Sequence, residues 1–292
     1  MEAMSGKTPG RARGVCVALL IAMSVSAPFG LRADATLPDA VRLFERQQYD
    51  DAKTVLEQRI SKNPADAGAQ YFLGRAYFML CDYERAIEHL NRAVNLDKTQ
   101  PDYYFWLGRA YGEKAQRSGL LKQAVLANKI RSAFERAVVL DSAHAEARTG
   151  LGNFYAQAPG FMGGSLDAAA EQAQALTLLD PLKGGLLSAR ILEEQKDPVA
   201  AEATYKELEK RYGNLPGASR LYGAYGKFLL RQRRIDDAIA KLEKQVTLEP
   251  SKLSAHFNLA AAFEAAGRSR DAADEYAKAA KMNPTCKPPK KH

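Results

Sequence analysis

A block of apolar and small residues returns about every 34 positions along this chain of 292 residues. The block LGRAY at 73–77 recurs at 107–111, and a looser copy, LGNFY, follows at 151–155. An alanine-rich stretch follows each copy, with its apolar residues three or four positions apart, the spacing of one helix face. A fixed period of this length predicts a stack of helical hairpins, because one hairpin cannot bury its apolar face alone.

The stretch 67–100 carries the pattern most clearly, with Gly74, Tyr77, Ala86, Leu90 and Ala93 at five packing positions. With these residues the chain resembles a tetratricopeptide repeat protein. The resemblance implies an all-α fold, a right-handed superhelix (α-solenoid) of about seven antiparallel hairpins. Gly or Ala at the crossing lets the two helices of a hairpin approach closely. The expected units are residues 33–66, 67–100, 101–144, 145–181, 182–215, 219–252 and 253–286.

The third unit is about ten residues longer than the period. The excess lies near Gly112–Lys129, with a turn expected at Ser118-Gly119. Apolar residues such as Leu121 and Val125 continue at helical spacing after this turn. We therefore expect two long helices that project beyond the neighbouring hairpins.

The fourth unit has a long connection between its helices, residues 158–165, with one proline and three glycines that exclude regular helix. Ser165 is expected to cap the helix that follows. Phe161 and Met162 are apolar residues on this loop. Two interpretations remain open: the loop contacts a ligand or partner, or both side chains fold back onto the hairpin of the third unit.

Residues 1–35 have the layout of a secretory signal peptide. A basic start precedes an apolar run at 14–27, and an A-x-A cleavage pattern follows at 33–35. The run is shorter than the roughly 18 residues of a spanning helix. We expect a cleaved, periplasmic protein of a bacterium; the alternative is an uncleaved anchor in the inner membrane. The last residues, 287–292, are expected to form a basic, disordered tail.

Cys81 and Cys286 remain after such a cleavage, 205 positions apart. A single bridge between them is possible in an oxidising compartment. The other interpretation is a buried helical Cys81 and a loose Cys286. The sequence itself does not decide between the two.

The sequence contains no motif for catalysis or for binding a metal or a cofactor. Its four histidines are far apart, and adjacent acids such as Glu193-Glu194 point away from each other on a helix. We therefore expect no enzyme, no cofactor and no metal. The net charge is +8, but four basic residues precede residue 36 and three lie in the last six positions. The repeats are thus only mildly basic, which argues against a nucleic-acid partner.

The family resemblance places the first helix of each unit on the inner, concave surface. The ninth position of five consecutive units then presents four cations and one amide, next to aromatic residues such as Tyr71 and Phe105. Such a face suits an extended acidic segment, because Arg forms paired hydrogen bonds with carboxylates. Alternatively, each Arg pairs with a local acid, as Glu113 lies four residues after Arg109. The five residues are Arg75, Arg109, Asn153, Arg190 and Lys227.

These features favour a non-catalytic scaffold for protein–protein interaction in the bacterial cell envelope, with a partner segment held in the concave groove. Contact with a membrane would be peripheral at most. The alternative function is a repeat subunit that binds a small ligand or lipid for an uptake system. In that case the long third unit and the loop with Phe161 and Met162 would close a small apolar chamber.

Overall fold

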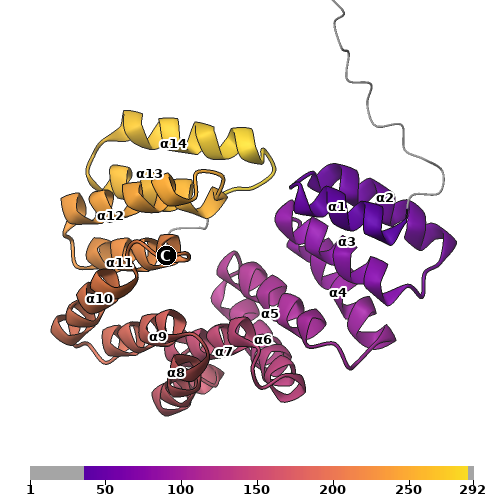
Figure 1. The fold of residues 1–292 in the computed structure, drawn as a ribbon, viewed down its shortest axis with the longest axis horizontal. Coiled ribbons are helices and arrows are strands. Elements are labelled where there is room, and N and C mark those ends of the chain that lie inside the picture. The colour runs from indigo at the N-terminus through magenta and orange to yellow at the C-terminus, as the bar shows by residue number, and fades with distance from the viewer. Residues whose placement is uncertain (1–35, 289–292) are drawn as a thin grey trace, which may run out of the picture. The chain divides into compact units, whose positions relative to one another are not determined.

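The computed structural model describes residues 36–288. The expected signal peptide and the end of the basic tail lie outside this range. Within it the chain forms only helices and connecting turns (Figure 1). The α-helices are α1 (Leu37–Glu45), α2 (Tyr49–Lys62), α3 (Ala67–Met79), α4 (Tyr83–Leu96), α5 (Pro101–Gln116), α6 (Leu120–Leu140), α7 (Ala145–Gln157), α8 (Leu166–Leu179), α9 (Pro181–Glu194), α10 (Pro198–Tyr212), α11 (Ala218–Arg231), α12 (Ile235–Leu248), α13 (Leu253–Ala265) and α14 (Ser269–Met282); a short 3₁₀ helix, η1, spans Gly160–Met162.

The helices pack in consecutive pairs, so the all-α solenoid expected from the sequence is confirmed. Each odd-numbered helix also contacts the next odd-numbered helix, from α1 to α13. Within residues 36–288, no two even-numbered helices contact each other. Helices on the inside of a curved stack lie closest together, so the odd-numbered helices form its inner face.

Aspartate and serine side chains fix where many helices begin. Asp66 and Ser165, for example, accept hydrogen bonds from the backbone N–H three residues later, at 2.9 and 3.2 Å. Such caps satisfy an N–H that the helix leaves free, and losing one costs about 1 kcal/mol. The turn inside five of the hairpins contains one residue with left-handed backbone: Gln47, Cys81, Lys196, Arg233 and Gly267.

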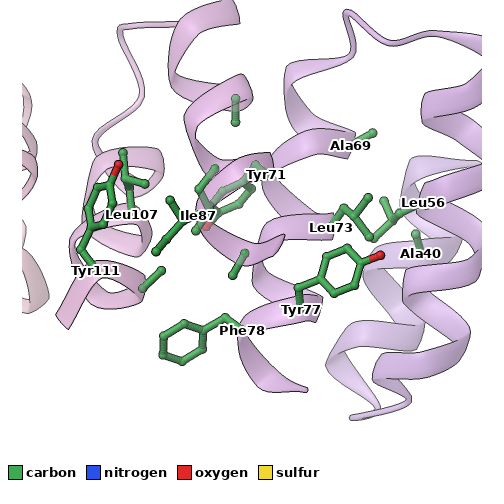
Figure 2. Packing of buried hydrophobic residues seen from close by; sticks show 14 of the residues in the cluster. Ala40, Leu56, Ala69, Tyr71, Leu73, Tyr77, Phe78, Ile87, Leu107 and Tyr111 are labelled. Atoms are coloured by element: carbon green, nitrogen blue, oxygen red, sulfur yellow. The ribbon is translucent and has the colours of Figure 1, made fainter. Parts of the chain in front are cut away.

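Small residues allow the helices of a hairpin to cross closely, as the sequence predicted. A Cβ atom on Gly74 would lie 2.6 Å from Leu90 and 3.1 Å from the carbonyl oxygen of Ala86. Larger apolar residues from α1 to α6 join in one buried cluster, part of which is drawn in Figure 2. Leu56, Leu73 and Leu90 are almost fully buried in it. The core is therefore shared between hairpins.

A polar bridge recurs at the start of three odd-numbered helices and was not predicted. In each case a side chain reaches the backbone carbonyl six residues earlier and also bonds a side chain on the next even-numbered helix. The side chain that forms the bridge differs in the three cases, but the positions of its two partners are the same. The three bridges join Gln70 to Pro64 and His89, Arg148 to Ser142 and Gln172, and His256 to Pro250 and Glu275.

The third hairpin has the long helices that the sequence predicted. Its α5 has 16 residues and α6 has 21, whereas the neighbouring α4 and α7 have 14 and 13. The turn lies at 117–119, as expected. Apolar side chains at the start of α6 stay exposed: Leu120 by 64%, Leu121 by 86% and Val125 by 66%.

The connection between α7 and α8 contains η1. Ala158 and Gly164 approach so closely that a Cβ on Gly164 would lie 1.7 Å from the carbonyl oxygen of Ala158. Met162 is buried and η1 packs against α6, but Phe161 is 80% exposed. The expectation that both side chains fold back onto the third hairpin therefore holds for Met162 and is wrong for Phe161.

Cys81 and Cys286 form a disulfide, with their Cα atoms 5.3 Å apart. The interpretation of a helical Cys81 and a loose Cys286 is wrong. Cys81 lies in the turn after α3 with a φ of 61°, and Cys286 is buried. Hydrogen bonds from Asn283 to the carbonyl of Met79 (2.8 Å) and from Thr285 to that of Leu80 (2.6 Å) hold the same segment. The last hairpin is thus tied to the second one.

Candidate functional site

The predicted inner-face residues all lie on odd-numbered helices, in the order α3, α5, α7, α9 and α11. They do not share one environment. Arg75 and Arg109 lie among aromatic rings, whereas Arg190 lies among carboxylates. The face therefore divides into two clusters.

Arg75 of α3 is surrounded by aromatic rings. Its guanidinium carbon lies 4.4 Å from the centre of the Phe44 ring and 4.7 Å from that of Trp106, with Tyr71 and Phe72 slightly farther away. An Arg75 N–H donates to the Tyr71 hydroxyl at 3.3 Å. Burial, the largest effect, raises the pKa of Tyr71 to about 12, so this hydroxyl stays protonated. Arg75 Nε is buried without a hydrogen-bond partner.

Arg109 of α5 shares Trp106 with Arg75. Its guanidinium carbon lies 4.3 Å from the centre of the Trp106 ring, 4.6 Å from that of Phe78 and 5.7 Å from that of Phe105. Burial lowers the pKa of Arg109 below its ordinary value, which is too high for the group to lose its charge at neutral pH. We call Arg75, Arg109, Phe44, Phe78 and Trp106 the Arg75–Arg109 cluster.

Within residues 36–288, neither arginine of this cluster has a carboxylate within ion-pair distance, because the nearby acids have other partners. The alternative interpretation, in which Arg109 pairs with Glu113, is wrong: a Glu113 carboxylate oxygen lies 2.6 Å from a guanidinium nitrogen of Arg117. Asp102 lies 3.2 Å from His144, and Glu146 lies 3.1 Å from Lys183. The cluster thus carries two positive charges that form no ion pair with these acids.

Arg190 of α9 has the local acids that the alternative interpretation expected. Its guanidinium lies 3.7 Å from Glu193 and 4.0 Å from Glu194. Glu193 is also paired with Arg231 and accepts a hydrogen bond from Tyr205 at 2.8 Å. We call Glu193, Arg190, Arg231 and Tyr205 the Glu193 cluster. Its single carboxylate has three partners, and the two arginines share its negative charge.

Lys227 of α11 differs from both clusters. Its side chain is exposed, and no carboxylate of the described residues pairs with it. Surrounding protein atoms on the inner face, followed by the positive charges of Arg190 and Arg231, lower the pKa of Lys227 to about 8. Asn153, the amide of the series, is half-buried and makes no side-chain hydrogen bond within the described chain.

Two family models match the chain, and both are described as tetratricopeptide repeat. One covers residues 43–104, and the other covers 186–248 and 224–285. Together they span more than half of the sequence. The chain is a tetratricopeptide repeat protein.

Solved structures support the fold of this repeat protein. It is similar to a tetratricopeptide repeat protein from Parabacteroides merdae, with a TM-score of 0.58 and 15% identity over 84% of this chain and 91% of the other. It also resembles a chain of the APC/C hetero-tetramer Cut9-Hcn1, with a TM-score of 0.54 and 12% identity over 85% of this chain. A third similar structure is an IFIT1 monomeric mutant with m7Gppp-AAAA, with a TM-score of 0.55 and 17% identity over 84% of this chain. The chain spans about half the length of these two, 46% and 54%. No curated protein sequence matches it.

The sequence pattern of the repeat protein missed three parts of the site. Trp106 contacts both arginines, but its position in the repeat did not mark it as an inner-face residue. Phe44 reaches Arg75 from α1, the preceding hairpin. Glu193 was interpreted as part of a solvated face, yet it is 7% exposed and central to its cluster. Contacts between units contribute to all three, from Trp106 and Phe44 to Arg75 and from Glu193 to Arg231, and a pattern within one unit does not contain them.

A pocket of about 610 Å³ lies beside the disulfide of the repeat protein. Neither Phe161 nor Met162 lines it, so it is not the apolar chamber that the sequence proposed. Tyr77, Tyr83, Cys81 and Thr285 line it together with five basic and three acidic residues. The charged residues are Lys53, Arg85, Lys114, Arg117, Lys122, Asp50, Asp82 and Glu84.

Two other features are absent from the described part of the chain. No three potential metal ligands converge there. No helix there is both long and apolar enough to cross a membrane.

Proposed function

We propose that this repeat protein is a non-catalytic scaffold that holds an extended acidic segment of a partner protein at the Arg75–Arg109 cluster. Tetratricopeptide repeats imply a scaffold for protein interaction in general. The acidic segment is inferred from one observation: two guanidinium groups on the inner face have aromatic neighbours and no carboxylate among the described residues.

The chemistry of the cluster favours carboxylates. A guanidinium that stacks on aromatic rings keeps its N–H groups in one plane, ready for paired hydrogen bonds with a carboxylate. Its lower hydration also reduces the cost of removing water when a ligand binds. Each charge-assisted contact typically contributes about 1.5–3 kcal/mol. Two such contacts give useful affinity to a short segment.

A photo-crosslinking amino acid at Phe105, a half-buried ring 5.7 Å from the Arg109 guanidinium, tests this function in cells. We expect crosslinks to a peptide rich in Asp or Glu, and their loss in the variant Arg75→Gln/Arg109→Gln. The control is Arg92→Gln, since Arg92 is a surface residue paired with Glu88. Equal crosslinking in both variants, or crosslinks to a segment without acids, would contradict the proposal.

We propose that the protein acts in the bacterial cell envelope, in the periplasm. The signal-peptide pattern of residues 1–35 supports this location, as does the disulfide, because such bonds persist in exported proteins. Fractionation with N-terminal sequencing tests it. We expect a periplasmic chain that begins just after Ala33 or Ala35; a cytoplasmic chain that begins at Met1 would contradict it.

A further inference from the structure

We propose that the first two turns of α6 form a contact site for the surface of an anionic lipid bilayer. Leu120, Leu121 and Val125 expose 64, 86 and 66% of their surface there. No other stretch of six residues in the described chain holds three large exposed apolar side chains. The next residues, Leu126 and Ala127, are buried, so the exposed group is confined to the start of α6.

The positions of these side chains follow from helix geometry. Leu121 and Val125 are four residues apart and therefore lie on the same side of α6. Leu120 is the first residue of the helix and lies beside them at its end. Together they form an apolar tip on the hairpin that is longer than its neighbours.

Two lysines lie next to the tip on α6. Lys122 and Lys129 lie three residues before and four residues after Val125, so they flank it on the helix surface. Both are exposed, and neither has a carboxylate partner within residues 36–288; the Lys129 ammonium lies 5.5 Å from the centre of the Tyr111 ring, on the α5 side of the helix. The first turn of α6 carries no acid. Lys122 also lines the charged pocket beside the disulfide, together with Lys114 and Arg117.

The size of the tip favours a bilayer over a protein partner. A stable protein interface buries roughly 800 Å² on each side, which three side chains at the end of a helix do not supply. A bilayer interface accepts single apolar side chains, and lysines beside them place their charge among anionic headgroups. The site shares no residue with the Arg75–Arg109 cluster, and it does not depend on the function proposed for that cluster.

A fluorescent reporter at the tip tests the proposal in the purified full chain. Trp106 is the only tryptophan, so the variant Trp106→Phe/Leu121→Trp reports the tip alone. Its matched control is Trp106→Phe/Leu178→Trp, because Leu178 of α8 is 85% exposed as well. The probes are vesicles of phosphatidylglycerol and vesicles of phosphatidylcholine, with brominated acyl chains as quenchers.

We expect a blue shift and bromine quenching at position 121 with phosphatidylglycerol vesicles, and neither change at position 178. Adding Lys122→Gln and Lys129→Gln to the reporter should weaken its apparent affinity by about fivefold for each lysine. Three results would overturn the proposal: no change at position 121, the same change at both positions, or equal response to the two lipids. The reporter is local, so vesicle binding through another part of the chain does not mimic contact at the tip.

Discussion

Arg109 and Arg190 occupy the same repeat position on α5 and α9, yet only Arg190 lies within ion-pair distance of carboxylates in the described chain. The residue three positions later differs: it is Gly112 after Arg109 and Glu193 after Arg190. Arg109 instead stacks on Phe78 and Trp106. One change in the repeat thus separates an arginine that lies among aromatic rings from one that is paired with carboxylates.

The comparison shows that a recurring cation is not by itself a binding residue. In the Glu193 cluster, the arginines hold two adjacent odd-numbered helices together through one buried carboxylate. In the Arg75–Arg109 cluster, aromatic rings do the packing and leave the charges without a carboxylate partner among the described residues. The first cluster joins two helices of the stack, and the second is the one to which we assign the proposed partner.

Breaking the disulfide should have the largest effect, because it ties the second hairpin to the last one. We expect Cys286→Ser to lower the free energy of unfolding by about 4 kcal/mol, since the bond closes a very long loop. Urea unfolding followed by circular dichroism measures this. Wild type with a reducing agent should match the variant; if the reducing agent leaves wild type unchanged, the bond carries no such stabilisation.

Removing Glu193 should have the next largest effect. Glu193→Leu leaves the buried Tyr205 hydroxyl without its acceptor and leaves Arg190 and Arg231 without their shared carboxylate. We expect a loss of about 3 kcal/mol in the same unfolding measurement, because the two arginines are partly exposed. The matched change in the other cluster, Arg75→Met, removes no ion pair within the described residues and should cost clearly less. Equal losses would mean that the two clusters do not differ as described.

The substitution Gly112→Glu should give Arg109 a carboxylate partner like the one that Arg190 has in Glu193. A Cβ at Gly112 meets no atom within 4 Å, so the position accepts a side chain. The new carboxylate lies three residues after Arg109, as Glu193 does after Arg190. We expect the affinity for a synthetic Asp-Ser repeat peptide to fall about tenfold, as expected for loss of one charge-assisted contact. Titration of Trp106 fluorescence measures it, with Gly112→Gln as the uncharged control; equal affinities for the two variants would contradict this explanation.

The smallest expected effect concerns pH and Lys227. Its folded-state pKa of about 8 lies below the ordinary lysine value, so the folded state holds its proton less tightly than the unfolded state does. Lys227 therefore destabilises the fold below pH 8, and this penalty is relieved as the pH rises from about 8 towards 10.4. We expect Lys227→Met to raise the unfolding midpoint at pH 7 and to raise it by less near pH 10, where much of the penalty is relieved. The gain at pH 7 should be small, because the exposed side chain keeps contact with water. A gain that is the same at both values would exclude titration of Lys227 as its cause.

Much of the fold could be predicted from residues such as Gly74 and Ala86, because close helix crossing needs small residues at a fixed spacing. The long third hairpin and the Ser165 cap followed from the same local rules. The partners of Arg109 and Arg190 could not be predicted in this way. Both have an acid nearby in sequence, but Arg117 takes Glu113, whereas Glu193 joins α9 to α11.

The sequence alone determined the period, the helices and the repeat family, because these depend on contacts within one hairpin and between identical neighbours. Only the tertiary structure decided which cations lie among rings and which pair with a carboxylate, since Phe44, Phe78 and Arg231 come from other hairpins. It also decided the pairing of Cys81 with Cys286, because the bond joins hairpins that are 205 residues apart in sequence. A repeat pattern describes contacts between neighbouring hairpins, and it does not predict contacts between hairpins that are far apart in sequence.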